Sequence, residues 1–114
     1  MTISELKKLL LDFQGISLST PKQANLEVYI LNGDDNKMFA LVNTSKLPLR
    51  LSLRCNPGLS ALLREKYESV MAGEKLDPRN WNTIILSGQL TDDEIHDLIR
   101  HSYELTKQIS SSVI

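Results

Sequence analysis

The feature that most constrains the fold is a strict alternation of apolar and polar residues near the middle of the chain. Every second residue from position 47 to position 55 is apolar: Leu47, Leu49, Leu51, Leu53 and Cys55. Successive side chains of a β-strand point to opposite faces of a sheet, so this pattern predicts a strand with one buried face. The polar residues between them, Arg50 and Arg54 among them, are therefore expected to face water or a partner.

The N-terminal residues predict a helix followed by a loop. Thr2 and Glu5 have the spacing of a capping box, in which each side chain satisfies a backbone donor at a helix start. Leucines then recur at helical spacing, which predicts a helix over residues 3–13. Residues 17–25 contain a proline and several small polar residues, a composition typical of a loop.

A β-hairpin is predicted between this loop and the alternating strand. Residues 26–31 and 37–42 are short and rich in strand formers. The intervening sequence 32–36, Asn-Gly-Asp-Asp-Asn, contains residues that tolerate the positive φ of tight turns. The two segments therefore pair as antiparallel strands.

The second half of the chain predicts a helix, a strand and a long helix. Asn56 can cap a helix, and Pro57 suits its first position because proline lacks only a donor that is unused there. Residues 81–87 predict a fourth strand. Thr91 and Glu94 have capping-box spacing and open an amphipathic helix.

These elements predict an α+β fold with the order α-β-β-β-α-β-α. The short connections favour an antiparallel sheet with helices packed on one face. We expect one domain over residues 1–114, since a single core typically serves about 100–150 residues, with a frayed tail over 110–114. The other face of the sheet is then available for function.

The composition of the chain argues against some functions and indicates the cellular compartment. The chain is 41% hydrophobic and 24% charged, as in an ordinary globular protein, and its formal net charge is −1. A strong non-specific polyanion binder usually has a domain pI above about 9, whereas the pI of this chain is about 6.1. A single cysteine excludes an intramolecular disulfide, and no run of apolar residues predicts a membrane span, so we expect a cytoplasmic protein with no membrane partner.

Several segments taken together resemble the MmcQ/YjbR family. The resemblance is carried, in order along most of the chain, by Lys37-Met38-Phe39-Ala40-Leu41, Leu51-Ser52-Leu53-Arg54-Cys55-Asn56-Pro57, Leu62-Leu63-Arg64-Glu65, Trp81-Asn82-Thr83-Ile84 and Ser102-Tyr103-Glu104-Leu105. It implies a frataxin-like (CyaY-like) fold in a "double-wing" arrangement and a role in binding DNA. It implies no enzymatic activity.

The chain departs from the family pattern ahead of the predicted fourth strand. Family members commonly have Asn-Lys-x-His-Trp there, whereas this chain has Asp77-Pro78-Arg79-Asn80-Trp81. The lysine and histidine of that run are both absent. If they contact phosphate in relatives, this chain binds DNA more weakly or not at all.

The candidate DNA-binding surface is the polar face of the alternating strand. Arg50 and Arg54 are placed to contact phosphate, and Trp81 to stack on a base or pack at the edge. Arg79 and Lys46, near strand ends, would extend the basic patch. The competing interpretation is a solvated strand face with charges that prevent aggregation, and Trp81 packed under a loop.

Two further classes of function are weighed against DNA binding. A protein-interaction or small-ligand module could use the same sheet face with no nucleic acid partner. An enzyme receives no support, since the sequence contains none of the common phosphate-loop or nucleophile motifs and Cys55 falls on the buried face. Asp93, Asp97 and His101 form a stripe that is better explained as an exposed helix face than as a metal site, so we expect no metal and no cofactor.

Overall fold

One antiparallel sheet forms the framework of the protein. The computed structural model describes residues 1–19 and 25–111. The strands, in the spatial order β1-β2-β3-β4-β6-β5, are β1 (Ile16–Ser19), β2 (Leu26–Leu31), β3 (Lys37–Asn43), β4 (Arg50–Arg54), β6 (Trp81–Ile85) and β5 (Val70–Ala72). Each neighbouring pair is antiparallel, which confirms the predicted sheet type.

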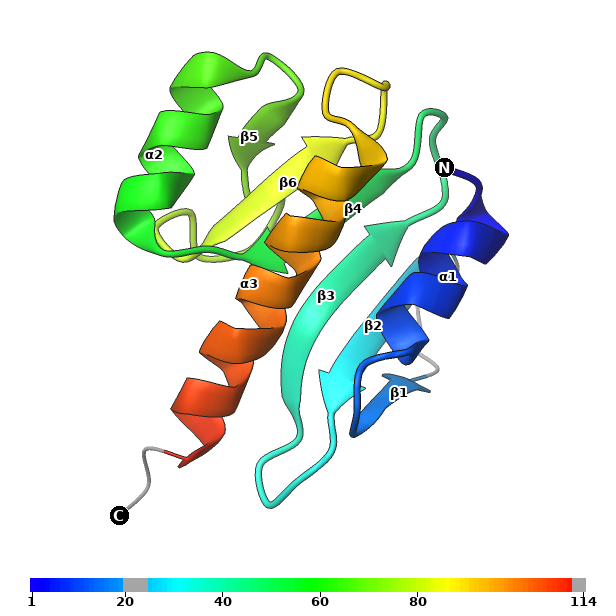
Figure 1. Cartoon of the computed structure of the whole chain (residues 1–114), viewed down its shortest axis with the longest axis vertical. Helices are drawn as coiled ribbons and strands as arrows, with labels where there is room; N and C mark the ends of the chain where they lie inside the picture. Colours follow the sequence, from blue (N-terminus) through cyan, green and yellow to red (C-terminus); the bar gives the residue numbers. More distant parts are fainter. Residues whose placement is uncertain (20–24, 112–114) are drawn as a thin grey trace.

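Three helices of the described residues cover one face of this sheet: α1 (Ile3–Leu11), α2 (Pro57–Lys66) and α3 (Asp92–Ser111). Figure 1 shows α3 crossing the middle of the sheet, with α1 over β2 and α2 near β5 and β6. The hydrophobic core lies between these two layers and contains Leu6, Leu10, Tyr29, Phe39, Ala40, Val42, Leu51, Leu53, Val70, Ile84, Leu90, Ile95 and Ile99. The predicted α+β class with helices on one face is confirmed. We call the opposite face of the sheet the outer face.

The predicted helix starts are present with their capping contacts. Thr2 and Glu5 exchange side-chain to backbone hydrogen bonds of 2.9 and 3.1 Å. Thr91 and Glu94 do the same at 2.9 and 3.1 Å. Helix α1 ends at Leu11, two residues before its predicted end. The predicted fraying at 112–114 lies outside the described residues, and α3 continues to Ser111.

Two short strands were not predicted. β1 occupies residues 16–19, so the prediction of a loop from residue 17 was wrong for its first three residues. β5 has only three residues and pairs with β6. Both lie at the edges of the sheet. Short edge strands have little periodicity, because their pairing is decided by the neighbouring strand rather than by their own composition.

A buried serine joins α3 to two central strands. The Ser102 hydroxyl donates to the Phe39 carbonyl at 2.6 Å and accepts the Arg54 backbone N–H at 2.9 Å. Ser102 is fully buried. Its hydroxyl therefore satisfies one polar group on β3 and one on β4 in a place that water cannot reach.

The connection between β5 and β6, residues 73–80, passes over the outer face. The Gly73 N–H donates to the Trp81 carbonyl at 3.0 Å, and the Glu74 N–H donates to Thr83 Oγ1 at 3.0 Å. A Cβ atom on Gly73 would lie 2.7 Å from the Trp81 Cβ, closer than such atoms pack. Only glycine fits at this point, so position 73 fixes how closely the connection lies on β6.

This connection changes the predicted character of the outer face. The alternation was read correctly for Leu49, Leu51, Leu53 and Cys55, which are buried, but wrongly for Leu47, which precedes β4 and is 88% exposed. On the other face, Arg50, Ser52 and Arg54 pair across the sheet with Ile85, Thr83 and Trp81. However, Ser52, Thr83 and Trp81 are buried, with exposed fractions of 4%, 0% and 5%. The expectation of an open, solvated platform at these positions was wrong, because the 73–80 connection covers β6 and part of β4.

Replacing Ser102 tests the contact between α3 and the sheet. Ser102→Ala leaves a buried carbonyl and a buried N–H without their partner, which is expected to lower the free energy of unfolding by about 1–3 kcal/mol. Ser4→Ala, on the exposed side of α1, serves as the control and should change it by less than about 0.5 kcal/mol. Urea denaturation followed by circular dichroism measures both; equal stability of the two variants would contradict the role given to Ser102.

Replacing Gly73 tests the close approach of the connection. Gly73→Ala forces a methyl group against Trp81, and we expect a loss of about 1–3 kcal/mol together with a shift of the Trp81 fluorescence maximum as the indole becomes hydrated. Gly33→Ala is the matched control, because its Cβ would meet no atom within 4 Å. An unchanged emission spectrum in Gly73→Ala would show that the connection does not depend on this contact.

Candidate functional site

A groove lies on the outer face between the sheet and the 73–80 connection. Its volume is about 450 Å³. Strands β2, β3 and β4 supply its floor, and the connection supplies one wall. The lining residues among those described are Leu26, Leu41, Asn43, Lys46, Arg50, Ser52, Glu74, Lys75 and Leu76.

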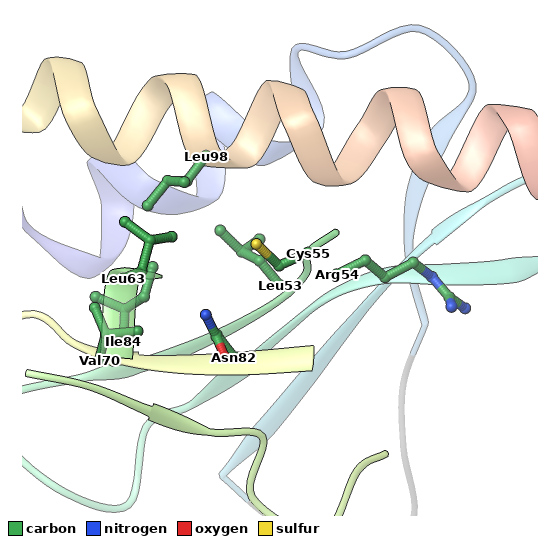
Figure 2. A pocket seen from close by; sticks show the side chains of 8 residues that line it. All are labelled: Leu53, Arg54, Cys55, Leu63, Val70, Asn82, Ile84 and Leu98. Carbon is green, nitrogen blue, oxygen red and sulfur yellow. The ribbon is translucent and has the colours of Figure 1, made fainter. Parts of the chain in front are cut away.

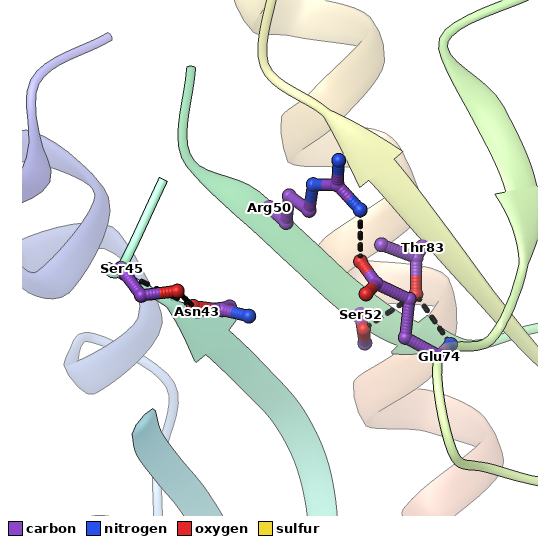
Figure 3. A network of polar contacts seen from close by, with 6 residues as sticks. All are labelled: Asn43, Ser45, Arg50, Ser52, Glu74 and Thr83. Atoms are coloured by element: carbon purple, nitrogen blue, oxygen red, sulfur yellow. Dashed lines mark hydrogen bonds and ion pairs between the residues drawn. The ribbon is translucent and has the colours of Figure 1, made fainter. Parts of the chain in front are cut away.

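An ion pair joins the floor of the groove to its wall. Arg50 Nη1 lies 2.8 Å from Glu74 Oε1, and the side chains of the two residues are 22% and 33% exposed. Figure 3 shows the Glu74 carboxylate directed at the Arg50 guanidinium across the outer face, with α3 behind the strands. Arg50, which the sequence placed on a phosphate-binding face, is therefore already paired with an anion of its own chain.

The backbone of Glu74 is anchored independently of its carboxylate. Its N–H donates to Thr83 Oγ1, and the Thr83 and Ser52 hydroxyls are 2.7 Å apart. Figure 3 shows this chain of contacts running from the connection to β6 and β4. Because Thr83 and Ser52 are buried, these bonds form in a region of low dielectric and hold the wall firmly against the sheet.

Two lysines stand at the rim of the groove. Lys46, from the β3–β4 connection, and Lys75, beside Glu74, both line the groove and are exposed. Lys75 has a φ of +58°, a left-handed conformation that non-glycine residues seldom adopt. With Arg50, the described lining contains three cations and one anion, Glu74, so the groove is more positive than the chain, whose net charge is −1.

The half-buried side chain of Arg54 contacts the buried ring of Trp81. The Arg54 guanidinium carbon lies 4.7 Å from the centroid of the Trp81 ring, and Arg54 Nε donates to the Met38 carbonyl at 2.8 Å. Burial lowers the pKa of Arg54 from its ordinary value. The indole is 5% exposed, so stacking of Trp81 on a base would require the connection to move.

Arg79 lies in a different place from the other predicted residues. Its side chain is 83% exposed and 3.6 Å from an Asp77 carboxylate oxygen. It lines an open depression of about 630 Å³ between α2 and the 73–80 connection, beside Pro57 and Arg64. The structure therefore brings Lys46 and Arg50 into one groove and Arg54 against Trp81, while Arg79 joins neither group.

Beneath this depression, Arg64 and Asn82 connect α2 to β6. Arg64 Nε and the Ser60 hydroxyl both donate to Asn82 Oδ1, at 2.7 and 2.6 Å. Arg64 Nη2 donates to the carbonyls of Pro78 and Trp81. Arg64 is thereby a structural cation, which holds the end of the 73–80 connection from the side of the helices.

A small internal cavity lies between α2, α3 and the sheet. Its volume is about 10 Å³, and Figure 2 shows that Leu63, Leu98 and Ile84 surround it with Cys55 nearby. Cys55 is buried, and this burial raises the pKa of its thiol to about 11. A thiol held protonated in an apolar environment is a poor nucleophile, and the cavity has room for about one water molecule.

His101 and Asp97 of α3 make contacts with different residues. His101 Nε2 accepts the Asn56 N–H at 3.2 Å, and Asp97 lies 3.6 Å from Arg100. Over residues 1–19 and 25–111, no group of three histidine, cysteine, aspartate or glutamate side chains is arranged to hold a metal ion. In the same part of the chain, no helix is both long enough and apolar enough to cross a membrane.

Sequence reasoning missed the wall of the groove. Glu74, Lys75 and Leu76 lie between the predicted second helix and the predicted fourth strand, and nothing in the composition of this segment indicates which face of the sheet it covers. The apolar floor residues Leu26 and Leu41 were placed on strands without assignment to a face. Their register, Leu41 opposite Ser52 and Leu26 opposite Asn43, puts them on the outer face.

Two uncharacterised proteins are similar to this chain in sequence. The chain is 30% identical over 107 residues to the uncharacterised protein YjbR of Escherichia coli K12, covering 91% of this chain and 86% of that protein. It is 37% identical over 57 residues to the uncharacterised protein YyaQ of Bacillus subtilis, about half of each chain.

Solved structures with the same fold are also similar to this chain. The crystal structure of Deinococcus radiodurans protein DR2400, described with the domain DUF419, superposes with a TM-score of 0.88 at 26% identity, covering 94% of this chain and 79% of that one. A crystal structure from Pseudomonas syringae gives a TM-score of 0.79 at 24% identity over 93% and 99% of the two chains and supports the fold alone. The YjbR family model matches residues 11–105, and the chain therefore belongs to the YjbR family.

Proposed function

We propose that this chain is a non-enzymatic binding module that holds a small, partly apolar ligand in the groove on its outer face. The observation that carries the proposal is the groove itself. Its volume of about 450 Å³ falls within the range of roughly 300–1,000 Å³ typical of small-molecule sites. It combines an apolar floor with a few convergent polar groups, as such sites do.

The contacts inside the groove favour binding over catalysis. The Ser52 hydroxyl is hydrogen-bonded to Thr83, and Thr83 also accepts the Glu74 N–H. A serine nucleophile instead needs a hydrogen bond to a general base. These two hydroxyls and the Glu74 N–H are thus engaged in holding the shape of the groove, which suits a preformed binding site.

DNA binding is the second candidate, favoured by the exposed cations Lys46, Lys75 and Arg79. Exposed lysines and arginines contribute affinity through contacts with phosphate. Against this candidate, the arginines of β4 and Trp81 are engaged within the chain. A DNA interface would therefore consist of rim cations without the stacking residue that the sequence suggested.

The small-ligand proposal is tested with N-phenyl-1-naphthylamine, a neutral apolar dye that fluoresces when it leaves water. We expect saturable binding to the native chain and a loss of at least about tenfold in affinity for Leu41→Glu, since a carboxylate on the apolar floor must be desolvated. Leu62→Glu is the matched control, because Leu62 is 65% exposed on α2, away from the groove. Circular dichroism checks that both variants are folded. If both bind the dye equally, the dye does not bind in the groove and the proposal is contradicted.

DNA binding is tested separately by fluorescence anisotropy with a labelled duplex. We expect no saturation at 150 mM salt up to about 10⁻⁴ M protein, the weak end of non-specific binding. The DNA candidate predicts instead that binding saturates and weakens steeply with salt. In that case, Lys46→Gln and Lys75→Gln should each reduce the slope of the logarithm of the binding constant against the logarithm of salt concentration by about 0.9. This result would replace the small-ligand proposal with DNA binding.

A further inference from the structure

We propose that the ligand of the groove is a small organic anion whose acidic group takes the place of the Glu74 carboxylate on Arg50. This inference rests on the proposed function and specifies the chemical class of the ligand. It begins from the charge of the groove. Three cations and one anion line it in the described residues, although the chain as a whole has a net charge of −1. The groove therefore carries an excess of positive charge.

Glu74 occupies the position that the acidic group of a ligand would take. Its carboxylate approaches one guanidinium nitrogen of Arg50 at 2.8 Å. Arginine presents five N–H donors in a planar fork that suits carboxylate, sulfonate and phosphate groups. Because both side chains are partly exposed, an incoming anion can reach Arg50 from solvent and compete with Glu74.

The carboxylate of Glu74 can leave without moving the wall. The backbone of Glu74 is held to Thr83, and that residue is held to Ser52. Only the side-chain torsions of Glu74 separate this anchor from the ion pair. Exchange of one anion for another therefore requires rotation of a single side chain, and the groove keeps its shape.

The rest of the groove matches the other parts of such a ligand. Leu26 and Leu41 on the floor and Leu76 on the wall offer contact to an apolar body. Asn43 pairs with Arg50 across β3 and β4, and its Oδ1 accepts from Ser45 at 2.9 and 2.6 Å. Figure 3 shows the amide nitrogen of Asn43 directed toward β4, where it can donate to an acidic group.

The experiment compares two dyes that differ by a single sulfonate group. 8-Anilinonaphthalene-1-sulfonate is N-phenyl-1-naphthylamine with one added sulfonate. We expect the native chain to bind the sulfonate at least about tenfold more tightly, the effect of a hydrogen bond to a charged group. Arg50→Gln and the double variant Lys46→Gln/Lys75→Gln should reduce this preference, whereas Arg79→Gln, outside the groove, should keep it.

Glu74→Gln tests the exchange itself. Removal of the internal anion should tighten binding of the sulfonate several-fold and leave binding of the neutral dye unchanged. Glu65→Gln, on the exposed side of α2, is the control for the change in net charge and should alter neither. Competition by decanoate or by 1-naphthoate for the bound sulfonate dye then shows whether the groove prefers an aliphatic or an aromatic acid. If neither acid displaces the dye, the inference is overturned.

The two proposals fail in different ways. In the first case, the neutral dye binds in a Leu41-dependent manner, but the sulfonate dye is not preferred or Glu74→Gln has no effect. The inference of an anionic ligand is then overturned, and the proposal of a small-ligand groove is retained. If neither dye binds saturably, both the inference and the proposed function are overturned.

Discussion

The close approach of Gly73 to Trp81 is the contact on which the outer face depends. A Cβ at position 73 would lie 2.7 Å from the Trp81 Cβ, so the chain can lie against β6 at this point only with glycine. From there the connection covers the indole and brings Glu74 to Arg50. The absence of a side chain at position 73 thus allows the connection to form the wall of the groove.

The fold was largely predictable because its pattern is local. Alternation over residues 47–55 predicted which side chains of β4 enter the core, and the capping boxes predicted the starts of α1 and α3. The edge strands β1 and β5 were missed, because pairing with a neighbour decides whether three or four residues form a strand. The relation to the CyaY-like fold stays a prediction.

The candidate site was less predictable, because exposure is a property of the whole structure. The alternation of side chains along β4 places Arg50 and Arg54 on the outer face. It does not indicate whether another segment of the chain covers that face. The covering segment has polar, turn-forming residues that are compatible with many paths. Burial of Trp81 under a loop was one of the two interpretations of the sequence, and only the structure decides between them. The pairing of Arg50 with Glu74 had no signal in the sequence, and together these observations moved the proposed role from a stacking surface for DNA to a groove for a small ligand.

The contacts of Arg64 have a consequence for how the two sides of the sheet communicate. This side chain extends from α2 and holds the carbonyls of Pro78 and Trp81, while Asn82 beside them is fixed by Ser60. Strand β6 thus carries α2 on one side and the groove wall on the other. The position of the groove wall is therefore fixed relative to α2 as well as to the sheet, because Arg64 holds two carbonyls at the end of the 73–80 connection.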